Sequence, residues 1–242
     1  MATLVSIQRA AVQAFAEKGY AATGIRDIAA KAGVTSGALY LHVSNKMAIL
    51  ESVMHLTLDE LIRLAAKATA EELPPAARLE GLVRAHVSVQ ATNPLTAQVV
   101  DGEVRILPAE HRPAILQKRD AYEAFWTSTL KAGLRTGDFV VDDVSIVRLA
   151  LLEMCNGVSH WYRSDGPRSL EQIHDIFVRL SFNLVGYRGR PNGSNPAVGS
   201  RPLRCEPQGT TSLEVPTAGA QTDLLPTTDA VRYERLGAPG VR

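Results

Sequence analysis

The stretch TGIRDIAAKAGVTSGALYLHVSNK, residues 23–46, predicts two short helices joined by a glycine turn. Thr23 is placed to cap a first helix over about residues 24–32, whose apolar side chains recur at helical spacing and share one face. Gly33 follows the last periodic position, and Thr35 is placed to cap a second helix directly after it. Two helices joined so closely must cross steeply. This is the helix-turn-helix arrangement, in which the second helix enters the major groove of DNA.

The segments on either side of this stretch are also periodic. Apolar residues at helical spacing predict a preceding helix over residues 2–18, which Gly19 ends. Ser44 is expected to begin the following helix, whose apolar stripe starts at Leu50 and runs for some six turns. That long helix would connect the DNA-reading unit to a larger helical body and act as the lever between them.

From Pro74 to Tyr187 the pattern stays helical, and no stretch alternates as a strand would. Prolines and glycines divide it into expected helices over residues 75–91, 95–106, 109–136, 142–162 and 169–186. The sequence therefore predicts an all-α protein, with a DNA-binding unit over residues 1–48 (motif about 24–43) and a body over residues 49–187.

Residues 188–242 differ in composition from the rest. They contain seven prolines and seven glycines, and their apolar residues show no period. Such a segment cannot bury enough apolar surface to fold alone, so a disordered, solvated tail is expected.

Composition excludes several classes of protein. The two cysteines, Cys155 and Cys205, are far apart and form no metal or redox motif, which favours a reducing cytoplasm. No apolar run approaches the roughly 20 residues needed to span a bilayer. The histidines are dispersed, and no nucleophile elbow or phosphate-binding loop is present, so neither an enzyme, a cofactor nor a metal site is expected. Net charge is +1 overall but +3 over the first fifty residues, where the motif lies.

Residues 7–50 carry a more specific pattern. Phe15 with Gly19 and Tyr20, the Ala-Gly-Val turn at residues 32–34, and Gly37, Tyr40, His42 and Lys46 stand at characteristic spacing. In this the chain resembles the TetR family of bacterial transcriptional regulators. The resemblance implies that Thr23 and the start of the second motif helix, Thr35, Ser36, Gly37 and Ala38, belong to the DNA-contacting surface, and that Tyr40, His42 and Lys46 hold phosphates.

Three departures from the family pattern stand out. Val43 replaces the usual aromatic residue, Met47 replaces the usual acid, and Arg9 is the only basic residue before or within the first helix apart from Lys18. Either this protein makes fewer phosphate contacts than its relatives, or its true start lies upstream. Fewer contacts would make the salt dependence of DNA affinity shallow.

The run over residues 151–187 resembles, less closely, the TetR branch that controls fatty-acid and steroid breakdown, several members of which respond to acyl-CoA thioesters. The resemblance implies a homodimer built on the last two long helices, with Gly157, Ile173 and Phe177 at the interface. Dimerisation is also expected because one short reading helix contacts too few bases. Trp126, Met154 and Trp161 are candidates for lining an effector cavity. Arg105 and Arg119, with Arg112 and Lys118, are the cations available for acyl-CoA phosphates.

The sequence thus predicts a cytoplasmic, homodimeric repressor that binds a palindromic operator on double-stranded DNA and is released by a small apolar effector, with acyl-CoA thioesters as the implied class. A second interpretation stays open: a ligand-binding or adaptor protein whose DNA-binding unit has weakened.

Overall fold

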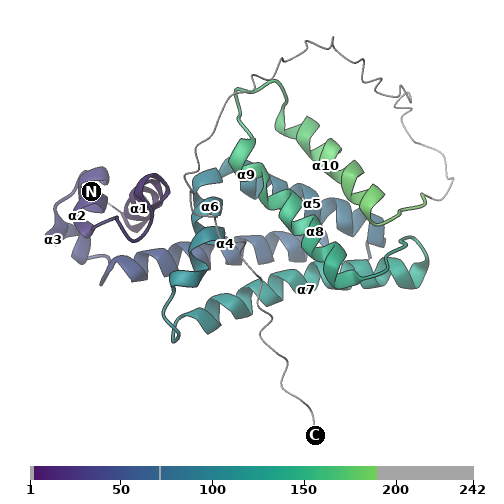
Figure 1. Ribbon diagram of the computed structural model, residues 1–242, viewed down its shortest axis with the longest axis horizontal. Helices are drawn as coiled ribbons and strands as arrows, with labels where there is room; N and C mark the ends of the chain where they lie inside the picture. The colour runs from purple at the N-terminus through teal and green to yellow at the C-terminus, as the bar shows by residue number, and fades with distance from the viewer. Residues whose placement is uncertain (1–2, 71, 190–242) are drawn as a thin grey trace, which may run out of the picture. The chain divides into compact units, whose positions relative to one another are not determined.

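The protein is all-helical, as predicted (Figure 1). The computed structural model describes residues 3–70 and 72–189, and no strand occurs among them. The sequence predicts disorder over residues 188–242. Residues 190–242 of that segment lie outside the described part of the chain. Within the described residues, no helix combines the length and apolar character that crossing a membrane requires.

The N-terminal unit consists of three helices: α1 (Leu4–Lys18), α2 (Ile25–Lys31) and α3 (Ser36–Tyr40). Gly19 ends α1 with a positive φ of 77°, and Gly33 provides the left-handed turn after α2 with a φ of 70°. Ile7 and Phe15 of α1 and Ile28 of α2 pack into one core with Leu39 of α3. This core fixes the angle at which α3 is presented.

Two helix starts differ from prediction. Gly24, and not Thr23, is the N-cap of α2, and the carboxylate of Asp27 in the first turn accepts from the Gly24 amide at 2.8 Å. α4 begins at Lys46 and not at Ser44, because the Asn45 side chain accepts from the Ala48 amide at 2.8 Å and so caps it.

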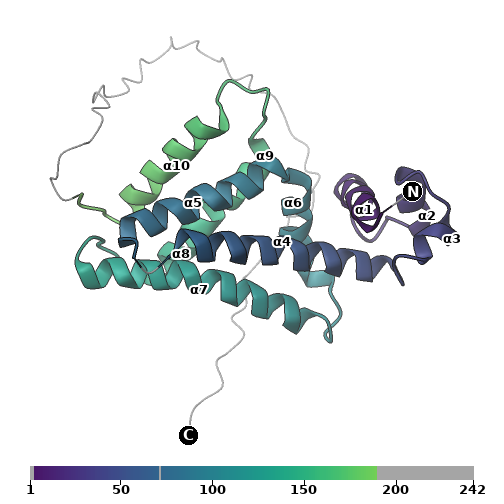
Figure 2. The same ribbon diagram turned by 180° about the vertical axis from the view of Figure 1, so that it is seen from behind.

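α4 (Lys46–Ala68) runs from the N-terminal unit into the body, where it lies along α7 and α5, as both Figure 1 and Figure 2 show. Its buried stripe includes Leu50, Val53 and Leu61, as the periodicity predicted. The predicted domain boundary at about residue 48 falls inside this continuous helix and stays a prediction.

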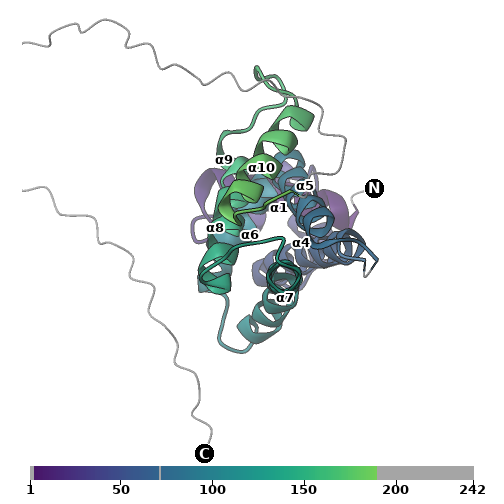
Figure 3. The ribbon, with the colours of Figure 1, turned by 90° about the vertical axis from the view of Figure 1, so that its right-hand side faces the viewer.

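The body follows the predicted helices closely, with two breaks. The segment expected as a helix over residues 95–106 changes to a 3-10 turn after Gly102, and the one over residues 142–162 is interrupted at Gly157. Figure 3 shows α8 and α10 side by side, with α10 packed on α5. The elements are α5 (Pro75–Thr92), α6 (Pro94–Gly102), η1 (Glu103–Ile106), α7 (Arg112–Thr136), α8 (Val144–Asn156), α9 (Val158–Trp161) and α10 (Leu170–Leu184).

Candidate DNA-binding unit and ligand-binding body

The first turn of α3 offers a surface of small side chains. Thr35 caps it, its hydroxyl accepting from the Ala38 amide at 3.1 Å. Gly37 is exposed, and a Cβ built there would meet only the Thr35 hydroxyl, at 3.9 Å. Ser36 and Ala38 are partly exposed. A backbone this open can approach base edges or phosphates closely, as the sequence suggested. Contact with DNA at these positions stays a prediction.

The end of α3 also projects outward. Tyr40 is 55% exposed and His42 is exposed, while Leu39 between the helices is fully buried. Leu41 is 84% exposed, which the sequence did not predict, because a leucine in a periodic segment is normally assigned to the core. Beside a reading helix, such a side chain is suited to contact a thymine methyl group.

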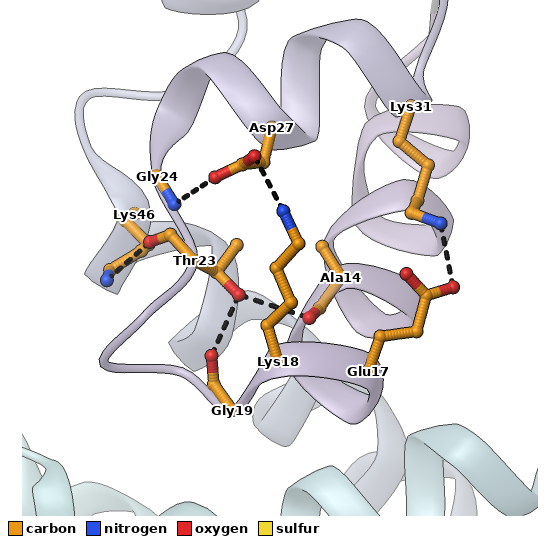
Figure 4. A network of polar contacts seen from close by, with 9 residues as sticks. All are labelled: Ala14, Glu17, Lys18, Gly19, Thr23, Gly24, Asp27, Lys31 and Lys46. Atoms are coloured by element: carbon orange, nitrogen blue, oxygen red, sulfur yellow. Dashed lines mark hydrogen bonds and ion pairs between the residues drawn. The ribbon is translucent and has the colours of Figure 1, made fainter.

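Thr23 lies inside the unit. Its hydroxyl is 2.8 Å from the Gly19 carbonyl oxygen and 3.1 Å from that of Ala14, and the residue is 1% exposed (Figure 4). It therefore ties the loop between α1 and α2 back to α1. Its predicted role as a helix cap is wrong, and its side chain has no surface to offer DNA.

Lys46 is also turned inward. Its ammonium donates to the carbonyl oxygens of Tyr20 and Thr23, each at 2.7 Å, and lies 3.5 Å from that of Ala21. It sits 4.1 Å from the centre of the Tyr20 ring, close enough for a cation–π contact. An ammonium has three hydrogens, and these carbonyls take all of them. Lys46 thus clamps the first loop onto the start of α4, and its predicted phosphate contact would require this clamp to open.

Two further cations of the unit are paired. Lys18 bonds to Asp27 at 2.9 Å and Lys31 to Glu17 at 2.8 Å (Figure 4). The Lys18 hydrogen bond, with that of the Gly24 amide, lowers the pKa of Asp27. In the described part of the chain, Arg9 on α1 and Arg26 on α2 have no recorded hydrogen bond or ion pair. Arg26 is exposed on the first motif helix, which crosses the DNA backbone in this geometry, and the sequence had not singled it out.

The body contains a buried polar cluster. His86 Nδ1 lies 2.7 Å from the Tyr122 hydroxyl, and His86 Nε2 lies 2.8 Å from Asn156 Oδ1. Gln90 Nε2 donates to the same Asn156 oxygen at 3.1 Å. Burial lowers the pKa of His86 to about 4 and raises the pKa of Tyr122, so both are neutral near pH 7.

A cavity of about 70 Å³ adjoins this cluster, formed between α4, α5, α6, α7 and α8. Of the predicted ligand residues only Arg119 lines it, and Arg119 also pairs with Asp101 at 3.7 Å. Trp126 is fully buried behind the cluster, edge-on to His86 and Tyr122. Met154 is half-buried on α8 outside the lining. The sequence had missed His86, Gln90 and Asn156, because isolated polar residues in helices give no signal until folding brings them together.

The remaining predicted ligand residues lie elsewhere. Trp161 is 49% exposed and stacks on Phe177, and Arg105 is exposed on η1. The expected phosphate-binding cations are largely engaged: Lys118 bonds to Asp59 at 2.5 Å, and Arg112 donates to the carbonyl oxygens of Arg105 and Leu107. The four cations therefore do not form a ready phosphate site.

The predicted dimer residues stay a prediction, and the protomer leaves little of two of them exposed. Ile173 and Phe177 are buried within the protomer, because the apolar face of α10 packs on α5. Gly157 is half-buried at the break between α8 and α9. The apolar side chains that α8 and α10 leave exposed are others: Ile146, Leu149, Leu180 and Leu184.

Two family models match this architecture. Residues 7–53 match "Bacterial regulatory proteins, tetR family", and residues 72–185 match "Tetracyclin repressor-like, C-terminal domain". The HTH-type transcriptional repressor KstR2 of Rhodococcus jostii is 31% identical over 169 residues, which cover 69% of this chain and 82% of that protein.

The chain belongs to the TetR family. It is a helix-turn-helix transcriptional regulator by that membership, and the named relatives are regulators and not enzymes.

Solved structures agree with this TetR assignment. The ketosteroid transcriptional regulator KstR2 of Mycobacterium tuberculosis is 26% identical with a TM-score of 0.70, covering 77% of this chain and 95% of that one. AibR, in complex with isovaleryl coenzyme A and operator DNA, shares the fold at 23% identity with a TM-score of 0.67, covering 74% of this chain and 97% of that one.

Proposed function

We propose that this TetR-family regulator is a homodimeric repressor that occupies a palindromic operator and is released by a small, largely apolar effector. The observation that carries the proposal is the pairing of an outward-facing α3 with a small cavity among the helices of the body. KstR2 is named a repressor, and AibR binds isovaleryl coenzyme A, so acyl-CoA thioesters are the first effector class to test.

The connection between cavity and DNA-binding unit runs through α6 and η1. Asp101, near the end of α6, pairs with Arg119 at the cavity. Glu103, two residues later and beyond Gly102, accepts from the Tyr20 amide at 3.3 Å. Tyr20 belongs to the loop that Lys46 clamps. An effector that displaces Asp101 would shift this junction and with it the contact to the DNA-binding unit.

Release from the operator requires only that the effector bind the form that does not bind DNA more tightly than the form that does. A 100-fold preference would weaken operator affinity by about 2.7 kcal/mol, which converts a nanomolar complex into one a hundred times weaker. The spacing of the two α3 helices, which must match successive grooves, is the quantity that the shift would change.

The test is operator binding to the DNA upstream of the protein's own gene, measured by gel shift or anisotropy. Ala38→Glu places an acid on the first turn of α3 and should abolish the specific shift. Ala16→Glu places the same acid on the exposed face of α1 and should leave it intact. Acyl-CoA thioesters of varied chain length should then release the DNA, and free CoA should not.

The alternative, an adaptor with a weakened DNA-binding unit, is favoured by the shortage of free cations in the unit. With Arg9 and Arg26 as the only unpaired cations in the described part of each DNA-binding unit, the slope of log affinity against log salt should be near −4 for a dimer. Absence of a specific shift at micromolar protein would decide for the adaptor, whereas a shallow slope with retained specificity supports the repressor.

A further inference from the structure

The buried cluster beside the cavity leaves one strong acceptor unused. Tyr122 donates to His86 Nδ1, His86 Nε2–H donates to Asn156 Oδ1, and Gln90 Nε2 donates to the same oxygen. With the imidazole proton on Nε2, Gln90 Nε2 also lies 3.1 Å from that nitrogen, as a second donor beside Asn156 Oδ1. Gln90 Oε1 has no hydrogen-bond partner among the described residues, although Gln90 is only 3% exposed. Buried polar atoms in proteins are nearly always paired, so this oxygen points to a missing donor.

The unpaired amide belongs to a residue that lines the cavity. The cavity volume of about 70 Å³ corresponds to the space of roughly two water molecules, or of a hydroxyl group with a short piece of carbon chain. Part of its lining is apolar, formed by Leu58 and Leu61 of α4 with Leu149 and Leu152 of α8. The site therefore suits the end of a molecule whose body is apolar.

The charge of the lining excludes an anion. Three carboxylates line the cavity, Asp101, Glu123 and Glu153, against the single cation Arg119. Asp101 lies 3.7 Å from Arg119, although burial raises the pKa of this carboxyl, and Glu123 pairs with Arg148 at 3.2 Å. His86 is held neutral by burial and supplies no positive charge. A carboxylate brought to Gln90 would meet net negative charge and another acceptor, whereas an uncharged donor would meet neither penalty.

We propose that the effector carries an uncharged hydroxyl group at its buried end, and that Gln90 Oε1 accepts a hydrogen bond from it. The inference rests on the proposed function, in that the cavity is taken to be the effector site. The inference adds the chemical class of the end of the effector that enters the cavity. A hydroxyl group binds there, a ketone at the same position lacks the hydrogen-bond donor, and a carboxylate is repelled.

The experiment uses matched six-carbon probes and the protein's own fluorescence. Trp126 lies with its ring centre 6.0 Å from that of His86, and Trp161 is the second of the two tryptophans in the chain. In the Trp161→Phe protein, Trp126 becomes the single reporter, and phenylalanine can keep the stacking on Phe177. Hexan-1-ol, hexan-2-one and hexanoate are then titrated separately.

Hexan-1-ol should change the Trp126 emission with a half-saturating concentration roughly tenfold below that of hexan-2-one, which is the ratio expected when one buried hydrogen bond is lost. Hexanoate should give no saturable change. Adding Gln90→Met, which removes the unpaired acceptor and keeps the side-chain volume, should bring the alcohol and the ketone to within about twofold. Gln98→Met, on α6 outside the cavity lining, should leave the preference unchanged.

Equal responses to hexan-1-ol and hexan-2-one, or no saturable response to either, would overturn the inference. So would an alcohol preference that survives Gln90→Met, because the hydroxyl would then be recognised elsewhere. Operator binding by the same Trp161→Phe protein is measured in parallel. Loss of specific DNA binding with a retained alcohol preference would refute the repressor function and leave the hydroxyl site standing. Retained DNA binding without an alcohol preference would refute the hydroxyl site and leave the repressor function standing.

Discussion

At the scale of single residues, the DNA-binding unit uses its polar side chains to hold itself together. Thr23 and Lys46 both satisfy carbonyl oxygens of the loop between α1 and α2, whose backbone has few partners of its own. Buried or half-buried carbonyls without donors would cost free energy, so these side chains replace the missing backbone hydrogen bonds. The geometry of the reading surface depends on them even without any contact to DNA.

Replacing Lys46 with methionine should therefore destabilise the protein. We expect a loss of about 1–3 kcal/mol in the free energy of unfolding, because two carbonyls lose a charged donor. Urea denaturation measures it, and Lys67→Met, at an exposed position near the end of the same helix, should change it by less than about 0.5 kcal/mol. An unchanged stability with a salt slope of DNA binding reduced by about one per site would instead show that Lys46 contacts phosphate.

His86 makes stability depend on pH. Its pKa falls from 6.5 to about 4 on folding, mainly through burial. Between these values the unfolded chain binds a proton that the folded protein does not, so stability decreases as pH falls from about 6.5 to 4, by about 3 kcal/mol in all. His174, whose pKa is also lowered, contributes in the same direction.

Urea denaturation across this pH window checks the His86 prediction. The His86→Gln protein should be less stable at pH 7 but should lose less stability on acidification. His42→Gln, at an exposed position, is the control for the substitution itself. A slope that is the same with and without His86 would show that other groups cause the acid sensitivity.

The sequence located the residues of the motif, but it did not predict correctly which of their side chains point outward and which point into the protein. Spacing placed Thr35 as a cap correctly, because a cap is defined by its neighbours along the chain. It could not show that Lys46 turns inward, because the carbonyls it meets lie about 25 positions earlier in the sequence. The His86 cluster was missed for the same reason: its members come from α5, α7 and α8.

At the scale of helices, α6 with η1 contacts both the N-terminal unit and the body, as α4 also does. Prolines and glycines located the ends of the body helices well, since they act through local backbone geometry. The breaks at Gly102 and Gly157 were not predicted as helix ends, because apolar spacing continues across both. The break at Gly157 lets α9 pack against α5 and α6.

The Glu103 contact can be tested through the exchange of a single amide hydrogen. In Glu103→Ala the Tyr20 amide loses its acceptor and should exchange about tenfold faster, whereas the Gly19 amide, bonded to the Phe15 carbonyl at 2.8 Å, should not change. Hydrogen exchange followed by NMR measures both. Glu110→Ala, at an exposed neighbouring position, is the control. Equal Tyr20 rates in the two variants would remove Glu103 from the proposed coupling.

At the scale of the whole molecule, the apolar residues left exposed by α8 and α10 define the expected dimer face. Leu180→Glu should convert the dimer into a monomer, because a charge would be buried at the centre of that face. Light scattering after gel filtration measures the mass, and specific operator binding should be lost with it. Leu116→Glu, at a comparably exposed leucine on α7, should stay dimeric. A dimer that persists in Leu180→Glu would move the interface elsewhere.

The smallness of the interior cavity has a kinetic consequence. Under the proposed function, about 70 Å³ cannot hold a whole effector, so the helices around the cavity would have to move apart to admit one. If opening precedes entry, the observed binding rate will level off at high effector concentration, at the rate of opening. Measured affinity will then understate the intrinsic affinity by the fraction of molecules that are open. The rate at which the effector releases the operator would thus be limited by the motion of the helices and not by diffusion of the effector.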